Sequence, residues 1–84
     1  MTRLLFFGRL RDVAGHAERE VNLPRDVATV AQLRIFLGAS DSALGEAISA
    51  RGVRVAINQN FCVDDQASVE GAHEIAFMSP LSGG

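Results

Sequence analysis

The sequence predicts an α+β fold in which one main helix packs across a single sheet. Two observations predict it. Short segments of the chain are apolar throughout or alternate between apolar and polar residues, which is typical of strands, and one longer segment has apolar residues at helical spacing. With 84 residues, the chain has room for one hydrophobic core and therefore for one domain.

Five segments are expected to form the strands: residues 4–7, 18–23, 53–57, 61–63 and 74–78. The first, LLFF, is apolar on both faces and suits the middle of the sheet. Gln59 and Asn60 are expected to turn the chain between the third and fourth strands, and Pro80 is expected to end the fifth. Residues 9–17 are mostly polar and predict a loop or a single helical turn.

Thr29 is expected to begin the main helix, because Thr29 and Gln32 have the spacing of a capping box. Apolar residues follow on one face of this helix, namely Val30, Leu33, Phe36 and Leu37. Gly38 is expected to end it in a left-handed conformation. A second, weaker helix is expected after Asp41, with Gly52 as its end.

The composition excludes several classes of protein. A net charge of −2 leaves no basic stripe for nucleic acid, and all eight basic residues are arginines. No apolar run approaches the roughly 20 residues that span a bilayer, and the short apolar start does not have the form of a signal peptide. A single cysteine, Cys62, excludes an internal disulfide and fits a reducing compartment. The chain is therefore expected to be cytoplasmic, with no nucleic-acid or membrane partner.

Residues with catalytic or metal-binding side chains are few and scattered. His16 and His73 fall in expected loops without a ligand spacing, and the simplest interpretation is a solvated histidine. Asp64 and Asp65 are adjacent at a turn, where aspartates form turns far more often than metal sites. Cys62 has no cationic partner visible in the sequence, so it is interpreted as a small packed residue rather than a reactive thiol. The sequence therefore predicts no metal and no catalytic site within the domain.

Apolar residues are expected on both faces of the sheet, although one main helix covers only one of them. Phe7 and Met78 alternate with Phe6 and Phe77, so the first two fall on the uncovered face. An exposed apolar patch on a small protein usually marks a partner surface. Phe7, Phe61 and Met78 are therefore candidates for a protein interface, and the alternative is that loops cover them.

The C-terminal residues have the form of a tail that delivers its own carboxylate. The chain ends in Gly83 and Gly84, shortly after an expected last strand and Pro80. Five extended residues reach about 17 Å beyond the body of the domain. Glycine has no side chain, so the last two positions are able to enter a narrow channel of another protein. The sequence thus predicts residues 1–79 as the domain and residues 80–84 as a flexible tail.

Four segments carry a resemblance to a known family: LFFGRLR at residues 5–11, VAINQ at 55–59, VEGAHEIAF at 69–77 and MSPLSGG at 78–84. They resemble the corresponding segments of the small subunit of molybdopterin synthase, a sulfur carrier of the ubiquitin-like β-grasp class. The opening motif distinguishes this family from the shorter thiamine sulfur carriers. The resemblance covers essentially the whole chain and implies a mixed sheet of four to five strands packed on one main helix.

The resemblance also implies a function in molybdenum cofactor biosynthesis. In this family an adenylating, E1-like enzyme activates the terminal glycine with ATP, and sulfur from a persulfide converts it to a thiocarboxylate. The thiocarboxylate donates sulfur to a pterin precursor inside the large subunit of molybdopterin synthase. Gly84 is then the reactive position, and the inserted tail consists of Pro80, Leu81, Ser82 and Gly83. The chain would bind no cofactor permanently and would act as a tethered substrate without a catalytic site of its own.

Two positions depart from the family. An aromatic residue is common where Met78 stands, and a proline is common where Ser79 stands. Carried over by position, Phe7, Phe61 and Met78 match the apolar contacts that the family makes with its partners, and methionine retains an adaptable contact of this kind. Serine in place of proline is expected to leave the tail less rigid, so that ordering it on insertion costs more entropy.

Three alternatives remain open. A sulfur carrier for thiamine or cysteine biosynthesis would use identical terminal chemistry. A ubiquitin-like protein modifier would join Gly84 to lysines of target proteins, although a chain without lysine cannot form lysine-linked chains on itself. A pure interaction module would have its two glycines by chance, because fold alone does not decide function.

Overall fold

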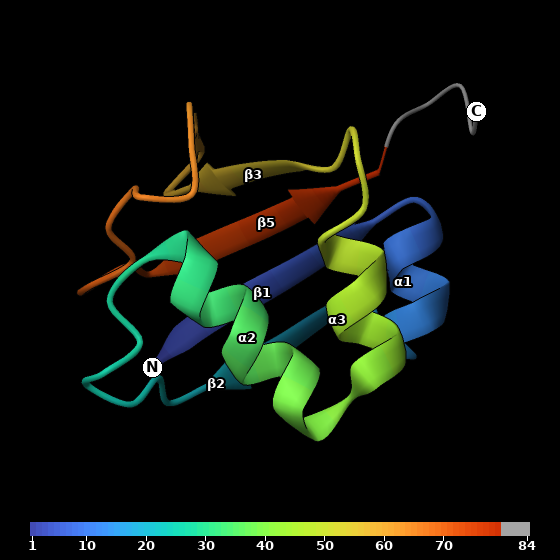
Figure 1. The fold of residues 1–84 in the computed structure, drawn as a ribbon, viewed down its shortest axis with the longest axis horizontal. Helices are drawn as coiled ribbons and strands as arrows, with labels where there is room; N and C mark the ends of the chain where they lie inside the picture. Colours follow the sequence, from blue (N-terminus) through green and yellow to red (C-terminus); the bar gives the residue numbers. More distant parts are fainter. Residues whose placement is uncertain (80–84) are drawn as a thin grey trace.

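The computed structural model describes residues 1–79, which form five strands and three helices (Figure 1). In chain order these are β1 (Thr2–Phe7), α1 (Arg9–Ala14), β2 (Glu18–Val21), α2 (Val30–Ser40), α3 (Ser42–Ile48), β3 (Arg54–Ile57), β4 (Asn60–Phe61) and β5 (Glu74–Met78). The last strand has the bounds expected from the sequence. The ends of the other four strands differ from the expected ones by one or two residues.

The strands form one mixed sheet in the order β2-β1-β5-β3-β4. The first and last strands in sequence, β1 and β5, lie side by side and run parallel, whereas the other neighbouring pairs are antiparallel. The parallel pairing extends from Arg3 opposite Glu74 to Phe7 opposite Met78. A mixed five-stranded sheet with its helices on one side is the ubiquitin-like β-grasp fold, so this prediction is confirmed.

The hydrophobic core lies between the sheet and the helices, which all pack on the same side of the sheet (Figure 1). Phe6 of β1 and Phe77 of β5 are almost fully buried there, and their rings stack with centroids 5.9 Å apart. The helices contribute further buried residues, namely Leu10, Val30, Leu33, Leu37, Leu44 and Ile48. Because burying a side chain of this size contributes about 1.5–3 kcal/mol, packing of these apolar stripes holds the helices on the sheet.

The helix α2 begins where the sequence predicts and ends later. Thr29 accepts a hydrogen bond from the amide of Gln32, whose side chain accepts one from the amide of Thr29, so the capping box is confirmed. The prediction that Gly38 ends the helix is wrong, because α2 continues to Ser40. Gly38 instead allows two helices to approach each other. A Cβ atom on Gly45 of α3 would lie only 2.5 Å from the Cα atom of Gly38.

The other two helices also differ from their predicted form. Residues 9–17 contain the helix α1, which ends at Gly15 in the left-handed conformation, with φ of 85°. The helix α3 is capped by the side chain of Asp41 but ends at Ile48, four residues before the predicted Gly52. Within residues 1–79, none of the helices has both the length and the apolar character needed to cross a membrane.

The turn between β3 and β4 falls one residue earlier than predicted. Ile57 pairs with Asn60, so the turn consists of Asn58 and Gln59 rather than Gln59 and Asn60. Both turn residues have positive φ, 49° and 71°, as a type I′ turn requires. The position of this turn determines on which face of the sheet Phe61 lies, because a shift of one residue would move it to the other face.

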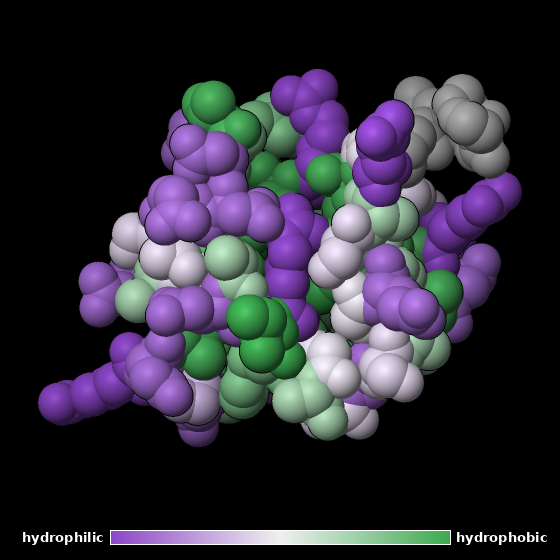
Figure 2. Space-filling view, in the orientation of Figure 1, coloured by the Kyte–Doolittle hydropathy of each residue, from purple (hydrophilic) through white to green (hydrophobic). Residues whose placement is uncertain are grey.

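The helix side of the domain has a mixed surface. Figure 2, in the orientation of Figure 1, shows hydrophilic and hydrophobic residues interspersed over it. Ile35 of α2, for example, is 72% exposed. Apolar residues scattered in this way are ordinary on a protein surface and do not indicate a binding site.

Candidate functional site

The opposite face of the sheet, which no helix of residues 1–79 covers, carries neighbouring apolar side chains. Because side chains alternate along a strand, Phe7 points away from the core that buries Phe6. We call this surface the open face, and its members are Leu5, Phe7, Ala56, Phe61, Ala76 and Met78. Strand pairing connects them in two rows, Leu5-Ala76-Ala56-Phe61 and Phe7-Met78. The three residues predicted as an interface therefore share one surface.

The largest side chains of the open face are accessible. Phe7 is 49% exposed and Phe61 is 55% exposed, whereas Met78 between them is half-buried. The loops within residues 1–79 thus leave both aromatic rings uncovered. An exposed aromatic pair on one small surface is the kind of anchor that protein interfaces use, because a ring buries much area at little entropic cost.

Charged side chains border the open face on both sides. The guanidinium carbon of Arg54 lies 4.5 Å from the centroid of the Phe61 ring, and Arg54 pairs opposite Met78. At the other edge, Nε of Arg3 and Oε2 of Glu18 are 3.7 Å apart, and both side chains are more than half exposed. Such exposed contacts contribute only about 0–1 kcal/mol each. Their effect is to give an apolar centre a polar rim, as in many interfaces.

The open face ends where the chain leaves the domain. Met78 is the last residue of β5, and Ser79 follows it with its hydroxyl hydrogen-bonded to the backbone at Phe7 and Arg9. The predicted tail residues Pro80, Leu81, Ser82, Gly83 and Gly84 lie outside the described residues. The described part of the candidate site is therefore an apolar surface that reaches the residue immediately before residues 80–84.

The two histidines and the aspartate pair do not form a site. His16 and His73 are both exposed, and His16 contacts the edge of the Phe6 ring with centroids 6.4 Å apart. A carboxylate oxygen of Asp64 accepts a hydrogen bond from the amide of Gln66, which confirms its role in a turn. Among residues 1–79, no three side chains of histidine, cysteine, aspartate or glutamate are grouped so as to hold a metal ion.

Cys62 lines a hollow of about 290 Å³ on the helix side of β3. The side chain is partly buried and packs against the hydrophobic core. Desolvation by burial is the main cause that raises the pKa of the thiol above its usual 9.0, and Asp64 and Asp65 raise it further. A hydrogen bond with the backbone of Ile57 is the larger cause that lowers the pKa, and Arg34, which donates hydrogen bonds to Asp65 and to the carbonyl of Ile48, lowers it least. A thiol with a raised pKa is a poor nucleophile at neutral pH.

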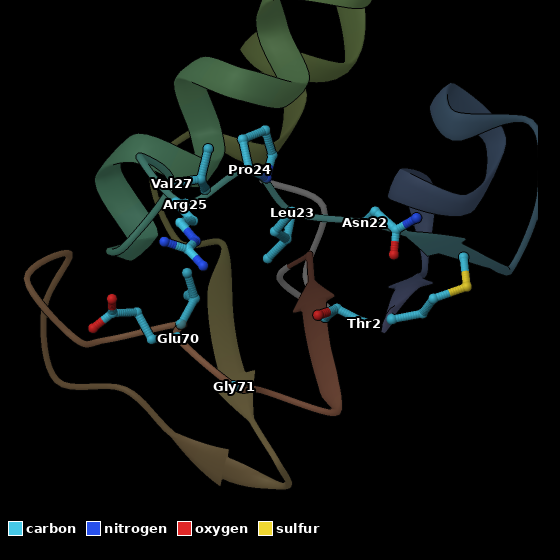
Figure 3. Close-up of a pocket in the computed structure, with 10 residues that line it drawn as sticks. Thr2, Asn22, Leu23, Pro24, Arg25, Val27, Glu70 and Gly71 are labelled. Carbon is cyan, nitrogen blue, oxygen red and sulfur yellow. The ribbon is translucent and has the colours of Figure 1, made fainter.

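A second hollow, of about 670 Å³, lies at the end of the sheet where β1 begins. Figure 3 shows that Thr2, the loop after β2 and the turn at Glu70 and Gly71 surround it. Its charged side chains, Arg25 and Glu70, are exposed at the rim. The hollow contains no paired acid and base, and β5 runs away from it toward Ser79, so it is separate from the open face.

Several members of the site escaped the sequence analysis. Leu5, Ala56 and Ala76 belong to the open face, and the alternation of side chains along their strands would have identified them. The contact of Arg54 with Phe61 depends on the register between β3 and β4, which the misplaced turn obscured. The contacts of Ser79 join segments distant in sequence and have no local signal.

Comparison with known proteins places this geometry in a family. The chain matches the ThiS family over residues 4–84. No curated protein matches it. SAMP1 from Haloferax volcanii superposes with a TM-score of 0.75 at 26% sequence identity, over 99% of this chain and 98% of that one. The HVO 2177 protein of Haloferax volcanii gives a TM-score of 0.75 at 24% identity over 99% and 85% of the two chains, a likeness of fold alone. Since the family match spans almost the whole sequence, the chain belongs to the ThiS family of ubiquitin-like sulfur-carrier domains.

Proposed function

We propose that the chain is the sulfur-carrying small subunit of molybdopterin synthase and that its thiocarboxylate forms on Gly84. One observation supports this most directly. Exposed Phe7 at the end of β1 pairs with half-buried Met78 at the end of β5, and only Ser79 lies between Met78 and residues 80–84. A partner that binds the open face would therefore receive Gly84 at a short, fixed distance along the chain.

The proposed chemistry begins with activation, because a carboxylate is a poor acyl donor whose substitution would have to expel oxide. A carboxylate oxygen of Gly84 attacks the α-phosphorus of ATP, and pyrophosphate leaves. The terminal sulfur of a donor persulfide then displaces AMP from the acyl adenylate. A second donor thiol cleaves the new S–S bond, which releases the thiocarboxylate on Gly84 and leaves a disulfide on the donor.

The chain itself contributes presentation rather than catalysis in this proposal. The most nucleophilic type of side chain in residues 1–79 is the single thiol of Cys62, and its raised pKa disfavours the thiolate. The base, the ATP site and the groups that stabilise the developing charge would belong to the adenylating enzyme and to the large subunit. The open face would bind each of these partners in turn.

The choice of pathway rests on the opening motif. Residues 5–11 resemble the molybdopterin synthase small subunit, and their side chains include Leu5 and Phe7 of the open face. A carrier for thiamine or cysteine biosynthesis is the alternative with identical terminal chemistry. A second candidate function is a ubiquitin-like modifier that joins Gly84 to lysines of other proteins. The structural likeness to SAMP1 is compatible with this function, although the fold alone does not decide between a carrier and a modifier.

Intact-mass spectrometry tests the carrier function. The protein is incubated with ATP, a persulfide donor and the adenylating enzyme of the same organism. We expect a mass increase equal to the replacement of one oxygen atom by sulfur. Deletion of Gly84 should abolish this increase, whereas Ser42→Ala, at an exposed position in α3, should retain it. An unchanged mass with an enzyme that releases pyrophosphate in the same assay would reject the proposal.

The thiocarboxylated protein then distinguishes the pathways. Mixed with the large subunit of molybdopterin synthase and the cyclic pterin precursor, it should lose its sulfur as the dithiolene product appears. Retention of the sulfur in this mixture would favour the thiamine or cysteine pathway. Covalent adducts between Gly84 and lysines of other proteins, detected after tryptic digestion, would favour the modifier.

A further inference from the structure

Ser79 bridges the end of β5 to the segment between β1 and α1. Its Oγ atom accepts a hydrogen bond of 3.2 Å from the backbone N–H of Arg9 and donates one of 3.4 Å to the backbone carbonyl of Phe7. These partners lie 70 and 72 positions away in the sequence. These contacts, which we call the Ser79 bridge, therefore fasten the last described residue to the segment between β1 and α1.

The Ser79 bridge also caps α1. The first N–H groups of a helix have no partner within the helix, and a serine at the N-cap usually supplies one. The N-cap residue of α1 is Gly8, which has no side chain and makes no capping hydrogen bond. Ser79 supplies the missing acceptor from a different strand, at the first residue of the helix, Arg9. The start of α1 and the end of β5 are thereby held together.

Gly8 is the residue that leaves room for this contact. Its φ of 63° and ψ of −135° lie where side chains are strongly disfavoured. A Cβ atom on Gly8 would lie 2.4 Å from Oγ of Ser79, well inside van der Waals contact, but an ordinary 3.7 Å from Cβ of Ser79. The hydroxyl of Ser79 thus occupies the space that a side chain at position 8 would need, and the two residues fit as a pair.

We propose that Ser79 is a positioning residue, which fixes the point at which residues 80–84 join the domain and so helps the adenylating enzyme to act on Gly84. This inference rests on the proposed function. A proline would restrict the backbone at this point through its own ring. Serine has no such restriction, and its hydrogen bonds to Phe7 and Arg9 supply the constraint instead. The sequence-based expectation that serine leaves the tail less rigid concerns residues 80–84, which lie outside the described residues.

The first experiment tests the Ser79 bridge without any partner. Hydrogen exchange of the Arg9 amide is measured by NMR in the wild type, Ser79→Ala and Ser79→Thr. Alanine removes the acceptor, so exchange should become about five-fold faster or more, the size expected for one lost hydrogen bond. Threonine keeps the hydroxyl and should restore slow exchange. Equal exchange in the wild type and Ser79→Ala would overturn the inference.

The second experiment tests positioning through the kinetics of adenylation. Ser79→Ala removes no side chain of the open face, so KM should stay the same while kcat falls about five-fold. Ser79→Thr should restore kcat. The matched control is Thr29→Ala, which also removes a capping hydroxyl, but from α2. The start of α2 lies toward the end of the sheet at which β1 begins, away from Ser79 (Figure 1). This control should retain both constants.

The outcomes separate the inference from the function on which it rests. If the wild type is adenylated and Ser79→Ala has the same kcat, the positioning role of Ser79 is rejected and the proposed function is not. A fall in kcat of equal size in Thr29→Ala also rejects it, because general destabilisation would then explain the loss. No adenylation of the wild type at all rejects both proposals.

Discussion

Phe7 and Met78 are the last pair of the parallel ladder between β1 and β5, and both side chains lie on the open face. The pairing brings the end of β1 and the end of β5 to one point. Because Ser79 follows directly, an apolar contact made by Phe7 is also a contact beside the origin of residues 80–84. The parallel central strands thus bring the apolar open face next to the origin of residues 80–84 in a chain of only 84 residues.

Phe7→Asp should weaken partner binding without unfolding the domain. The side chain is 49% exposed, so its replacement should change the free energy of unfolding by about 1 kcal/mol or less. A charge in the apolar centre of an interface should raise the dissociation constant for the adenylating enzyme about ten-fold or more. Urea denaturation and isothermal titration calorimetry measure the two effects separately.

Ile35→Asp is the matched control for this substitution. Ile35 is 72% exposed on α2, on the helix side of the sheet. The Ile35→Asp variant should therefore bind the enzyme as tightly as the wild type does. Equal affinity of Phe7→Asp and the wild type would remove the open face from the interface. Equal weakening in both variants would indicate a general effect of charge.

Gly45→Ala should destabilise the domain although alanine is the better helix former. Alanine gains about 1 kcal/mol in a helix relative to glycine. Its Cβ atom would meet backbone of Gly38 at 2.5 Å, and separating packed elements costs about 1–3 kcal/mol. We expect a net loss of about 1 kcal/mol in urea denaturation. Gly38→Ala, whose Cβ atom would lie 3.3 Å from Gly45, should cost less. A more stable Gly45→Ala would contradict the close helix contact.

The fold was predictable wherever the signal was local. The capping box of Thr29 and the alternation in β5 each lie within a few residues, and both predictions are confirmed. The prediction for Gly38 was wrong because a glycine in a helix either ends the helix or allows a close contact. The contact with Gly45 of another helix shows that Gly38 has the second role. A contact between separate elements cannot be deduced from the spacing on either one.

The site shows the same division. Alternation along β1 and β5 placed Phe7 and Met78 on the uncovered face, and the exposure of Phe7 follows from the absence of a helix there among residues 1–79. The contact of Arg54 with Phe61 depends on the register between β3 and β4. The contacts of Ser79 depend on the parallel pairing of β1 with β5. Predicting either would need the three-dimensional arrangement first.

Cys62 should react slowly with alkylating agents and should become reactive only at high pH. Burial raises its pKa above the usual 9.0. The pH midpoint of its reaction with iodoacetamide should therefore lie above 9.0 in the native protein and return toward 9.0 in denaturant. Cys62→Ala should abolish the reaction. A native midpoint below 9.0 would instead indicate an activated thiol.

The same raised pKa predicts how stability depends on pH. Below pH 9.0 the thiol is protonated in both the folded and the unfolded chain, so it adds no dependence. Between 9.0 and the higher folded value, the unfolded thiol loses its proton while the folded one keeps it. The free energy of unfolding should therefore fall as pH rises through this window. Cys62→Ala should have a smaller decline in urea denaturation, and an equal decline would show that other groups cause it.

Gln59→Gly should stabilise the domain by correcting the turn between β3 and β4. Gln59 has a φ of 71°, a left-handed conformation that costs a residue with a side chain about 1 kcal/mol or more. Its neighbour Asn58 suits the other turn position, and Asn-Gly is the preferred pair for a type I′ turn. Glycine also makes the unfolded chain more flexible, which offsets part of the gain, so we expect about 0.5 kcal/mol in urea denaturation.

Gln66→Gly provides the comparison for this last effect. Gln66 is exposed and does not have a positive φ, so glycine there only increases the entropy of the unfolded chain and should be slightly destabilising. Opposite signs for the two variants would tie the gain to the conformation of the turn. Because this turn sets the register that places Phe61 on the open face, Gln59→Gly should also retain the affinity for the adenylating enzyme. A stabilised variant with lost affinity would mean that glycine had shifted the register of β4.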